Sequence, residues 1–198
     1  MGPSRLEAFS DGVLAIIITI MVLELHVPHE ATFAALGPVL PTLFCYLLSF
    51  INVGIYWNNH HHLLHACRRV TGGILWANLL LLFWLSLIPF TTAWMGENHF
   101  APLPTLLYGV VLLLGAASYE VLQQAIIIAQ PDQPELRAAF GSDRKGKLSL
   151  TLYGFAMATA WWWPWIAVAL YVLVAMIWLV PDRRVERALR MRPGHDTR

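Results

Sequence analysis

The chain has few charged residues for its size. Lys, Arg, Asp and Glu make up 13% of its 198 residues, about half their share in soluble domains. Hydrophobic residues reach 58%, which leaves too little polar surface to cover a water-soluble globule of this size. The composition therefore excludes a disordered chain and a collagen-like fibre, and it indicates a membrane protein.

Other features are missing as well. The formal net charge is only +1, so no basic surface for nucleic-acid phosphates is expected. Two cysteines, Cys45 and Cys67, are too few for a disulfide framework, and Cys45 lies in an apolar run that predicts a small buried residue. The sequence contains no GxSxG, Walker loop, dinucleotide fingerprint or TVGYG filter. We expect no enzyme activity and no cofactor.

Long apolar runs dominate the sequence. About 20 apolar residues in a helix span the hydrocarbon core of a bilayer. The last run, from Leu148 to Val180, contains no charged residue and is too long for one span. The segment 161–165, Trp-Trp-Trp-Pro-Trp, combines a helix breaker with residues that favour the membrane interface, so a hairpin is expected there. The predicted spans are 6–25, 39–57, 74–94, 103–125, 148–163 and 165–180. These runs predict an all-α membrane protein of six transmembrane helices.

The distribution of positive charge is consistent with six spans. With that number, every Lys and Arg falls on one side of the membrane, while the opposite loops hold Glu30 and Glu97 and no cation. The positive-inside rule then predicts that both termini are cytoplasmic. We expect residues 1–180 to form the transmembrane domain and residues 181–198 a basic cytoplasmic tail. The cationic residues are Arg5, Arg68, Arg69, Arg137, Arg144, Lys145, Lys147, Arg183, Arg184, Arg187, Arg190, Arg192 and Arg198.

The first span carries a polar start and an aliphatic stripe. Asp11, with Ser10 beside it, is either a helix N-terminal device or part of a buried polar cluster that pins this helix to its neighbours. Above it, Ile16, Ile20 and Leu23 share one helix face, with Thr19 beside them. From the residues alone, such a stripe indicates packing or contact with lipid.

A histidine run follows the second span. His61 and His65 have the spacing of metal ligands on a helix. The run has neither an HExxH motif nor a CxxC pair nor a nearby inward carboxylate, so no metal site is predicted. In the third span, Asn78 is a lone amide expected to hydrogen-bond to another helix. Glu120 lies in the inner part of the fourth span, where it is expected to reach the cytosol.

Several of these residues resemble one family. The first span reads Arg-x-x-x-Phe-Ser-Asp-Gly-Val-x-Ala-Ile-x-x-Thr over residues 5–19, and it resembles the opening helix of the transmembrane protein 175 family of potassium channels in its prokaryotic form. Trp57-x-x-His60, Asn78 and the segment 87–90, Leu-Ile-Pro-Phe, resemble that family's second and third helices. Six spans in about 200 residues resemble one repeat of the family.

The resemblance implies a potassium-preferring cation channel in the cell membrane of a prokaryote. One repeat per chain implies a homotetramer surrounded by lipid, with K⁺ as the permeant ion. The first helices would line the pore without a carbonyl filter. Ile16, Ile20 and Leu23 would form its hydrophobic constriction, and Thr19 would supply hydroxyl groups nearby. Ile17 would face a neighbour or lipid.

The resemblance also implies a structural polar network that holds the pore helix without touching the permeating ions. Its members would be Arg5, Phe9, Ser10, Asp11, Trp57, His60 and Asn78. Two other classes of function stay open. A proton-coupled secondary transporter would use Asp11 or Glu120, and it would require paired broken helices near the midplane. A metal-dependent intramembrane enzyme would use the histidine run.

Overall fold

The computed structural model describes residues 2–133 and 144–179. Within these ranges the chain is helical and contains no strand. Its elements are α1 (Pro3–Leu23), the 3₁₀ helix η1 (Phe33–Val39), α2 (Leu40–Ala66), α3 (Gly72–Ser86), α4 (Ile88–Glu97), α5 (Pro102–Ala129), α7 (Arg144–Ala160) and α8 (Pro164–Leu179). η1 and α2 form one continuous span and α3 and α4 form one interrupted span, so the eight described elements make six rods and the predicted six-helix fold is confirmed.

Four of the six rods are long and apolar enough to cross a membrane. They cover Pro3–Leu23, Phe33–Ala66, Gly72–Glu97 and Pro102–Ala129, and α8 is a shorter apolar helix. The predicted hairpin lies between α7 and α8. There the amide N–H groups of Trp162 and Trp163 donate to the Thr159 carbonyl, at 3.1 and 2.8 Å, and Pro164 begins α8.

Two rods differ most from the predicted spans. α2 continues to Ala66, nine residues past the predicted end at Trp57, because hydropathy marks the apolar part of a helix rather than its hydrogen-bonded length. The third rod is broken at Leu87, which ends α3 and begins α4. Pro89 lies in the first turn of α4, where its missing N–H costs no hydrogen bond. The predicted tail, 181–198, lies outside the described residues.

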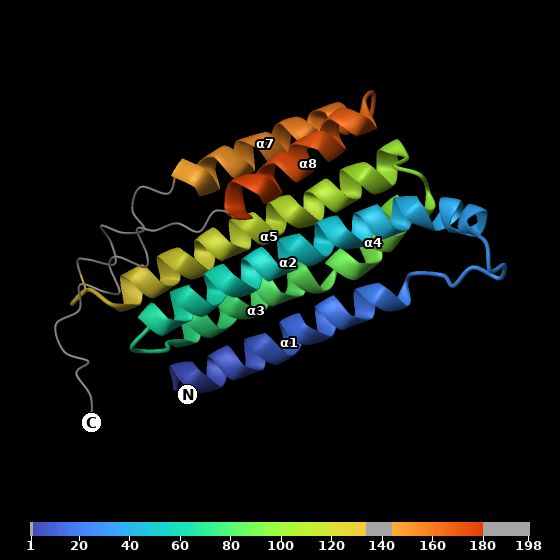
Figure 1. The fold of residues 1–198 in the computed structure, drawn as a ribbon. Helices are drawn as coiled ribbons and strands as arrows, with labels where there is room; N and C mark the ends of the chain where they lie inside the picture. Colours follow the sequence, from blue (N-terminus) through green and yellow to red (C-terminus); the bar gives the residue numbers. More distant parts are fainter. Residues whose placement is uncertain (1, 134–143, 180–198) are drawn as a thin grey trace.

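α1 lies at one edge of the bundle, with α7 and α8 at the opposite edge (Figure 1). It packs on α2, α3 and α4. Its buried residues recur every three or four positions, as expected for one face of a helix. They are Leu6, Ser10, Leu14, Ile17 and Met21. The other face of α1 therefore has no neighbour within the described part of the chain.

At Gly96 the helices α4 and α2 pack too closely to leave room for a side chain. A Cβ added at Gly96 of α4 would lie 2.6 Å from the backbone Cα of Thr42 in α2, a contact that cannot be relieved by moving a side chain. We expect Gly96→Ala to destabilise the protein by about 1–3 kcal/mol, the usual cost of overpacking. Thermal denaturation in detergent measures this loss. Gly54→Ala is the control, since nothing lies within 4 Å of its Cβ position, and equal stability of both variants would contradict the prediction.

Candidate functional site

The four residues predicted to line a pore lie on the exposed side of α1. Ile16 is 58% exposed, Ile20 42% and Leu23 78%. Thr19 lies among them, and its hydroxyl donates to the carbonyls of Ala15 and Ile16, both at 3.0 Å. Such an apolar surface needs lipid or a second chain to cover it. Ile17, in contrast, is only 4% exposed and packs inside its own chain, so of the two expected surroundings it has a protein neighbour and not lipid.

Three of the predicted network residues meet in a buried cluster. Ser10, His60 and Asn78 are each at most 1% exposed, and they come from α1, α2 and α3. Asn78 donates its amide N–H to Ser10 Oγ at 3.0 Å, and its Oδ1 lies 2.7 Å from His60 Nε2. Because Oδ1 is an acceptor, His60 carries its proton on Nε2 in this arrangement. One amide thus ties three helices together.

A second pair joins α1 to α2 nearer the surface. The Trp57 indole donates to Asp11 Oδ1 at 3.0 Å, and Trp57 is 47% exposed. The predicted network therefore divides into a buried cluster and this half-exposed pair. Arg5 and Phe9 have exposed side chains and belong to neither group. Within one chain they are free to contact lipid, solvent or another copy.

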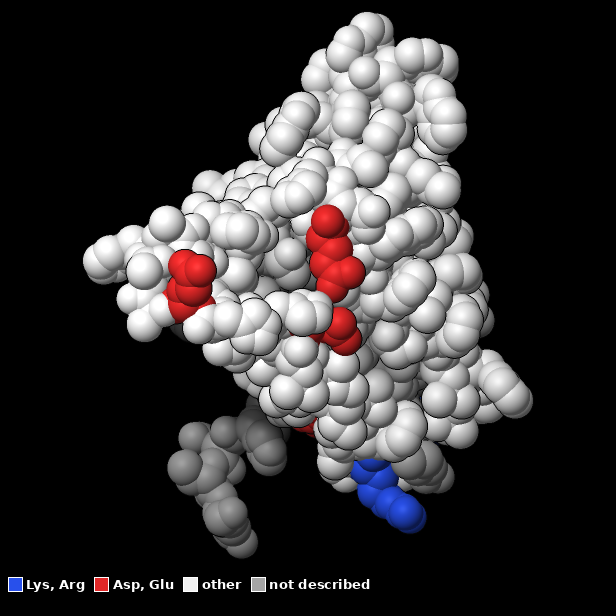
Figure 2. Space-filling model, turned by 90° about the vertical axis from the view of Figure 1, so that its right-hand side faces the viewer, with Lys and Arg blue, Asp and Glu red and all other residues white. Residues whose placement is uncertain are grey.

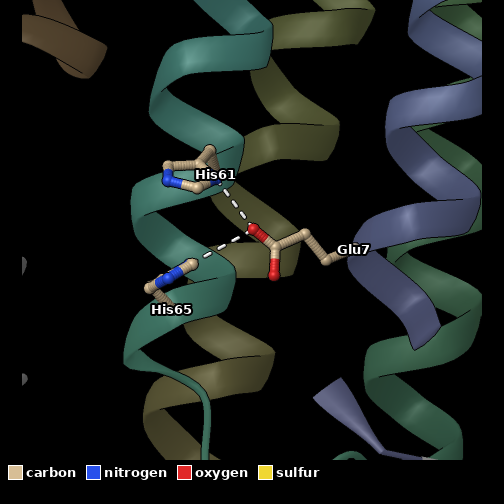
Figure 3. Close-up of side chains that lie close together, drawn as sticks. All are labelled: Glu7, His61 and His65. Atoms are coloured by element: carbon tan, nitrogen blue, oxygen red, sulfur yellow. Dashed lines mark ion pairs between the residues drawn. The ribbon is translucent and has the colours of Figure 1, made fainter. Parts of the chain in front are cut away.

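The structure also forms a cluster that the sequence did not predict. Glu7 Oε1 lies 2.7 Å from His61 Nδ1 and 3.2 Å from His65 Nδ1 (Figure 3). These three side chains come from α1 and α2, and Glu7 is 18% exposed at its side chain. The histidine run has no carboxylate near it in the sequence, but α1 supplies one, Glu7, in the folded chain.

Glu120 lies apart from these clusters. Its Oε1 accepts from Gln124 at 3.0 Å, one helical turn away. It lines a small cavity of about 50 Å³ with Asn52, Tyr56 and Ser149. Asp11 and Glu120 thus have separate partners. Among the described residues, no hydrogen bond brings the two carboxylates into one polar site.

Comparison with known proteins identifies the family. A family model described as the endosomal/lysosomal potassium channel TMEM175 matches residues 5–89. A potassium channel from Chryseobacterium sp. is 52% identical over 190 residues, which cover 96% of this chain and 99% of the relative. The human endosomal/lysosomal proton channel TMEM175 is 32% identical over 116 residues, which cover 52% of this chain and 23% of the human protein.

A solved structure shows the same fold. The crystal structure of a lysosomal potassium-selective channel TMEM175 homolog from Chamaesiphon minutus matches with a TM-score of 0.77 and 28% identity. The match covers 92% of this chain and 97% of the solved one. The Chryseobacterium relative and the Chamaesiphon minutus structure both match over nearly the whole chain, so the chain belongs to the TMEM175 family of ion channels.

Proposed function

We propose that the chain forms a potassium-preferring cation channel in which α1 lines the pore of a homotetramer. The observation that carries this proposal is the outward apolar stripe of Ile16, Ile20 and Leu23 on a helix at the edge of the bundle. A pore lined by this stripe cannot lie inside one chain. It requires the same stripe from other copies, arranged around a common axis.

The chemistry of the stripe suits a gated cation path. A ring of four Ile16 side chains, followed by rings of Ile20 and Leu23, would be apolar and would exclude water when narrow. Four Thr19 hydroxyls beside these rings would replace part of the hydration shell of an ion. K⁺ holds its water less strongly than Na⁺, so a pore that strips water favours K⁺. The names of the bacterial relatives support this preference.

The buried cluster and the Asp11–Trp57 pair serve as the frame of this pore. Ser10, His60 and Asn78 fix the inner half of α1 against α2 and α3. Ser10 lies on the buried face of α1, and His60 and Asn78 reach it from α2 and α3, so in this proposal they do not line the path. We assign them a structural role.

The charge distribution supports a topology with both termini in the cytoplasm of a bacterial cell. Figure 2 looks onto the end of the bundle where α1 finishes; acidic side chains are spread over it, and a Lys or Arg shows only at its lower edge. Glu24, Glu30 and Glu97 belong to the segments at this end. Arg68 and Arg69 follow α2 at the opposite end, where cations favour the cytoplasm.

Cysteine accessibility tests this topology. In a background with Cys45 and Cys67 replaced, we expect a cysteine at position 30, between α1 and α2, to react with an impermeant reagent applied to intact cells. A cysteine at position 2, at the N-terminus, should react only after the cells are opened. Labelling of position 2 from outside would contradict the proposed orientation.

Bilayer recordings test the function. Purified protein in a lipid bilayer, with K⁺ on one side and Na⁺ on the other, should give unitary currents with a reversal potential displaced towards that of K⁺. A proton-coupled transporter that uses Asp11 or Glu120 would give no unitary currents, and its flux would follow an applied pH gradient. A reversal potential that follows pH instead of K⁺ would make protons the permeant ion and would overturn the potassium preference.

A further inference from the structure

We propose that Glu7, His61 and His65 form a binding site for a divalent transition-metal ion, with Zn²⁺ as the best match, that clamps α1 to α2. The three ligand atoms lie within 4.8 Å of one another. In a tetrahedral zinc site with bonds of about 2.0–2.2 Å, neighbouring ligand atoms are about 3.3 Å apart. The two distances from Glu7 Oε1, 2.7 and 3.2 Å, are close to this spacing, so only small side-chain movements are needed.

The ligand set determines the kind of ion. Two imidazole nitrogens and one carboxylate oxygen suit Zn²⁺ and its neighbours Cu²⁺, Ni²⁺ and Co²⁺, whereas Mg²⁺ and Ca²⁺ require more oxygen ligands. His61 and His65 are 39% and 57% exposed at their side chains, so the ion can enter from water. A water molecule can complete the coordination, as in zinc sites with three protein ligands.

Neighbouring residues hold the ligands in place. His61 and His65 are one turn apart on α2, and their ring centroids are 4.4 Å apart. Trp57, one turn earlier, stacks on His61 with a centroid distance of 6.3 Å, and its indole is fixed by Asp11. Such outer contacts orient metal ligands and raise affinity. Among the described residues, the ion pairs of Glu7 are with these two histidines alone, so no Lys or Arg competes with the metal there.

The site is separate from the proposed pore. Glu7 lies between α1 and α2, on the side of α1 away from Thr19 and Leu23. A bound metal would fix the inner end of α1 to α2 through three strong bonds. Its binding is measured without any current, so failure of the metal site and failure of the proposed channel function are distinguishable.

Zinc binding to the purified full chain in detergent tests the proposal. Equilibrium dialysis followed by elemental analysis should give one Zn²⁺ per chain, and Mg²⁺ should not displace it. Zn²⁺ should also raise the thermal denaturation temperature, because it binds the folded state. Glu7→Gln keeps the shape of the side chain, and His61→Ala and His65→Ala each remove one ligand. Each substitution should lower affinity by at least about 100-fold and abolish the thermal shift.

His29→Ala is the control, because it removes an exposed histidine that lies outside α1 and α2 and is not one of the three ligands. It should bind Zn²⁺ as the unmodified chain does. Co²⁺ in place of Zn²⁺ should give the visible absorption of a four-coordinate site, and this absorption should be lost in Glu7→Gln. Absence of Zn²⁺ from the unmodified chain, or full binding by the double variant of His61→Ala and His65→Ala, would overturn the proposal.

Discussion

The His60→Ala substitution is expected to weaken assembly of the tetramer much more than it changes ion preference. His60 is 1% exposed, and its Nε2 donates to Asn78 Oδ1 at 2.7 Å. Without the imidazole, a buried acceptor loses its main donor at a cost of about 1–3 kcal/mol, and a cavity adds to that cost. Asn78 also joins α3 to α1 through Ser10. Loss of the His60–Asn78 hydrogen bond therefore loosens α1, the helix that lines the proposed pore.

Light scattering on the detergent-purified protein measures the fraction of tetramer, and bilayer recordings measure the K⁺/Na⁺ preference of the channels that still form. Asp11→Ala should act in the same direction with a smaller effect, since its Trp57 partner is half-exposed and water replaces part of the lost hydrogen bond. His62→Ala controls for loss of a nearby histidine. Normal assembly with altered selectivity in both His60→Ala and Asp11→Ala would place these residues in the conduction path instead.

The fold follows from the sequence because membrane helices leave a strong pattern. Apolar length, the Trp161–Trp165 break and the one-sided positive charge are each visible in the chain. The interruption at Leu87 was not predicted, since the run 74–94 is free of charged residues on both sides of it and a proline in the first turn of α4 does not change that pattern. Helix bounds were missed for the same reason: α2 continues through polar residues to Ala66, where hydropathy no longer distinguishes helix from loop.

The site was only partly visible because its contacts join distant parts of the chain. Glu7 is 54 residues from His61, and neither residue alone indicates the other. One signal was available. Glu7, Ser10 and Asp11 are three and four residues apart, so they share a helix face. α1 and α2 are antiparallel, and Asp11 contacts Trp57. The residue one turn before Asp11 must therefore lie opposite the residue one turn after Trp57, which places Glu7 against His61.

The second large effect is expected at Ile16. It is the stripe residue nearest Gly12 and is 58% exposed in the single chain. In the proposed tetramer, four Ile16 side chains meet on the axis and leave no room for a hydrated ion. Asparagine has a similar size and brings hydrogen-bonding groups, so water can enter the ring. Ile16→Asn should therefore raise conductance or open time several-fold, and it should lower discrimination between K⁺ and Na⁺, as read from the reversal potential in single-channel recordings.

The control must lie on α1, be exposed, and face away from the axis. Ile17→Asn fails this requirement, because Ile17 is buried in its own chain and an amide there would cost folding energy whatever the pore does. Val22 is 46% exposed and lies about 120° around the helix from Ile16, outside the stripe of Ile16, Ile20 and Leu23, so Val22→Asn makes the same apolar-to-amide change off the proposed constriction. Open channels with Val22→Asn but not with Ile16→Asn would move the pore to another face of α1. A verified current unchanged by either variant would remove α1 from the conduction path altogether.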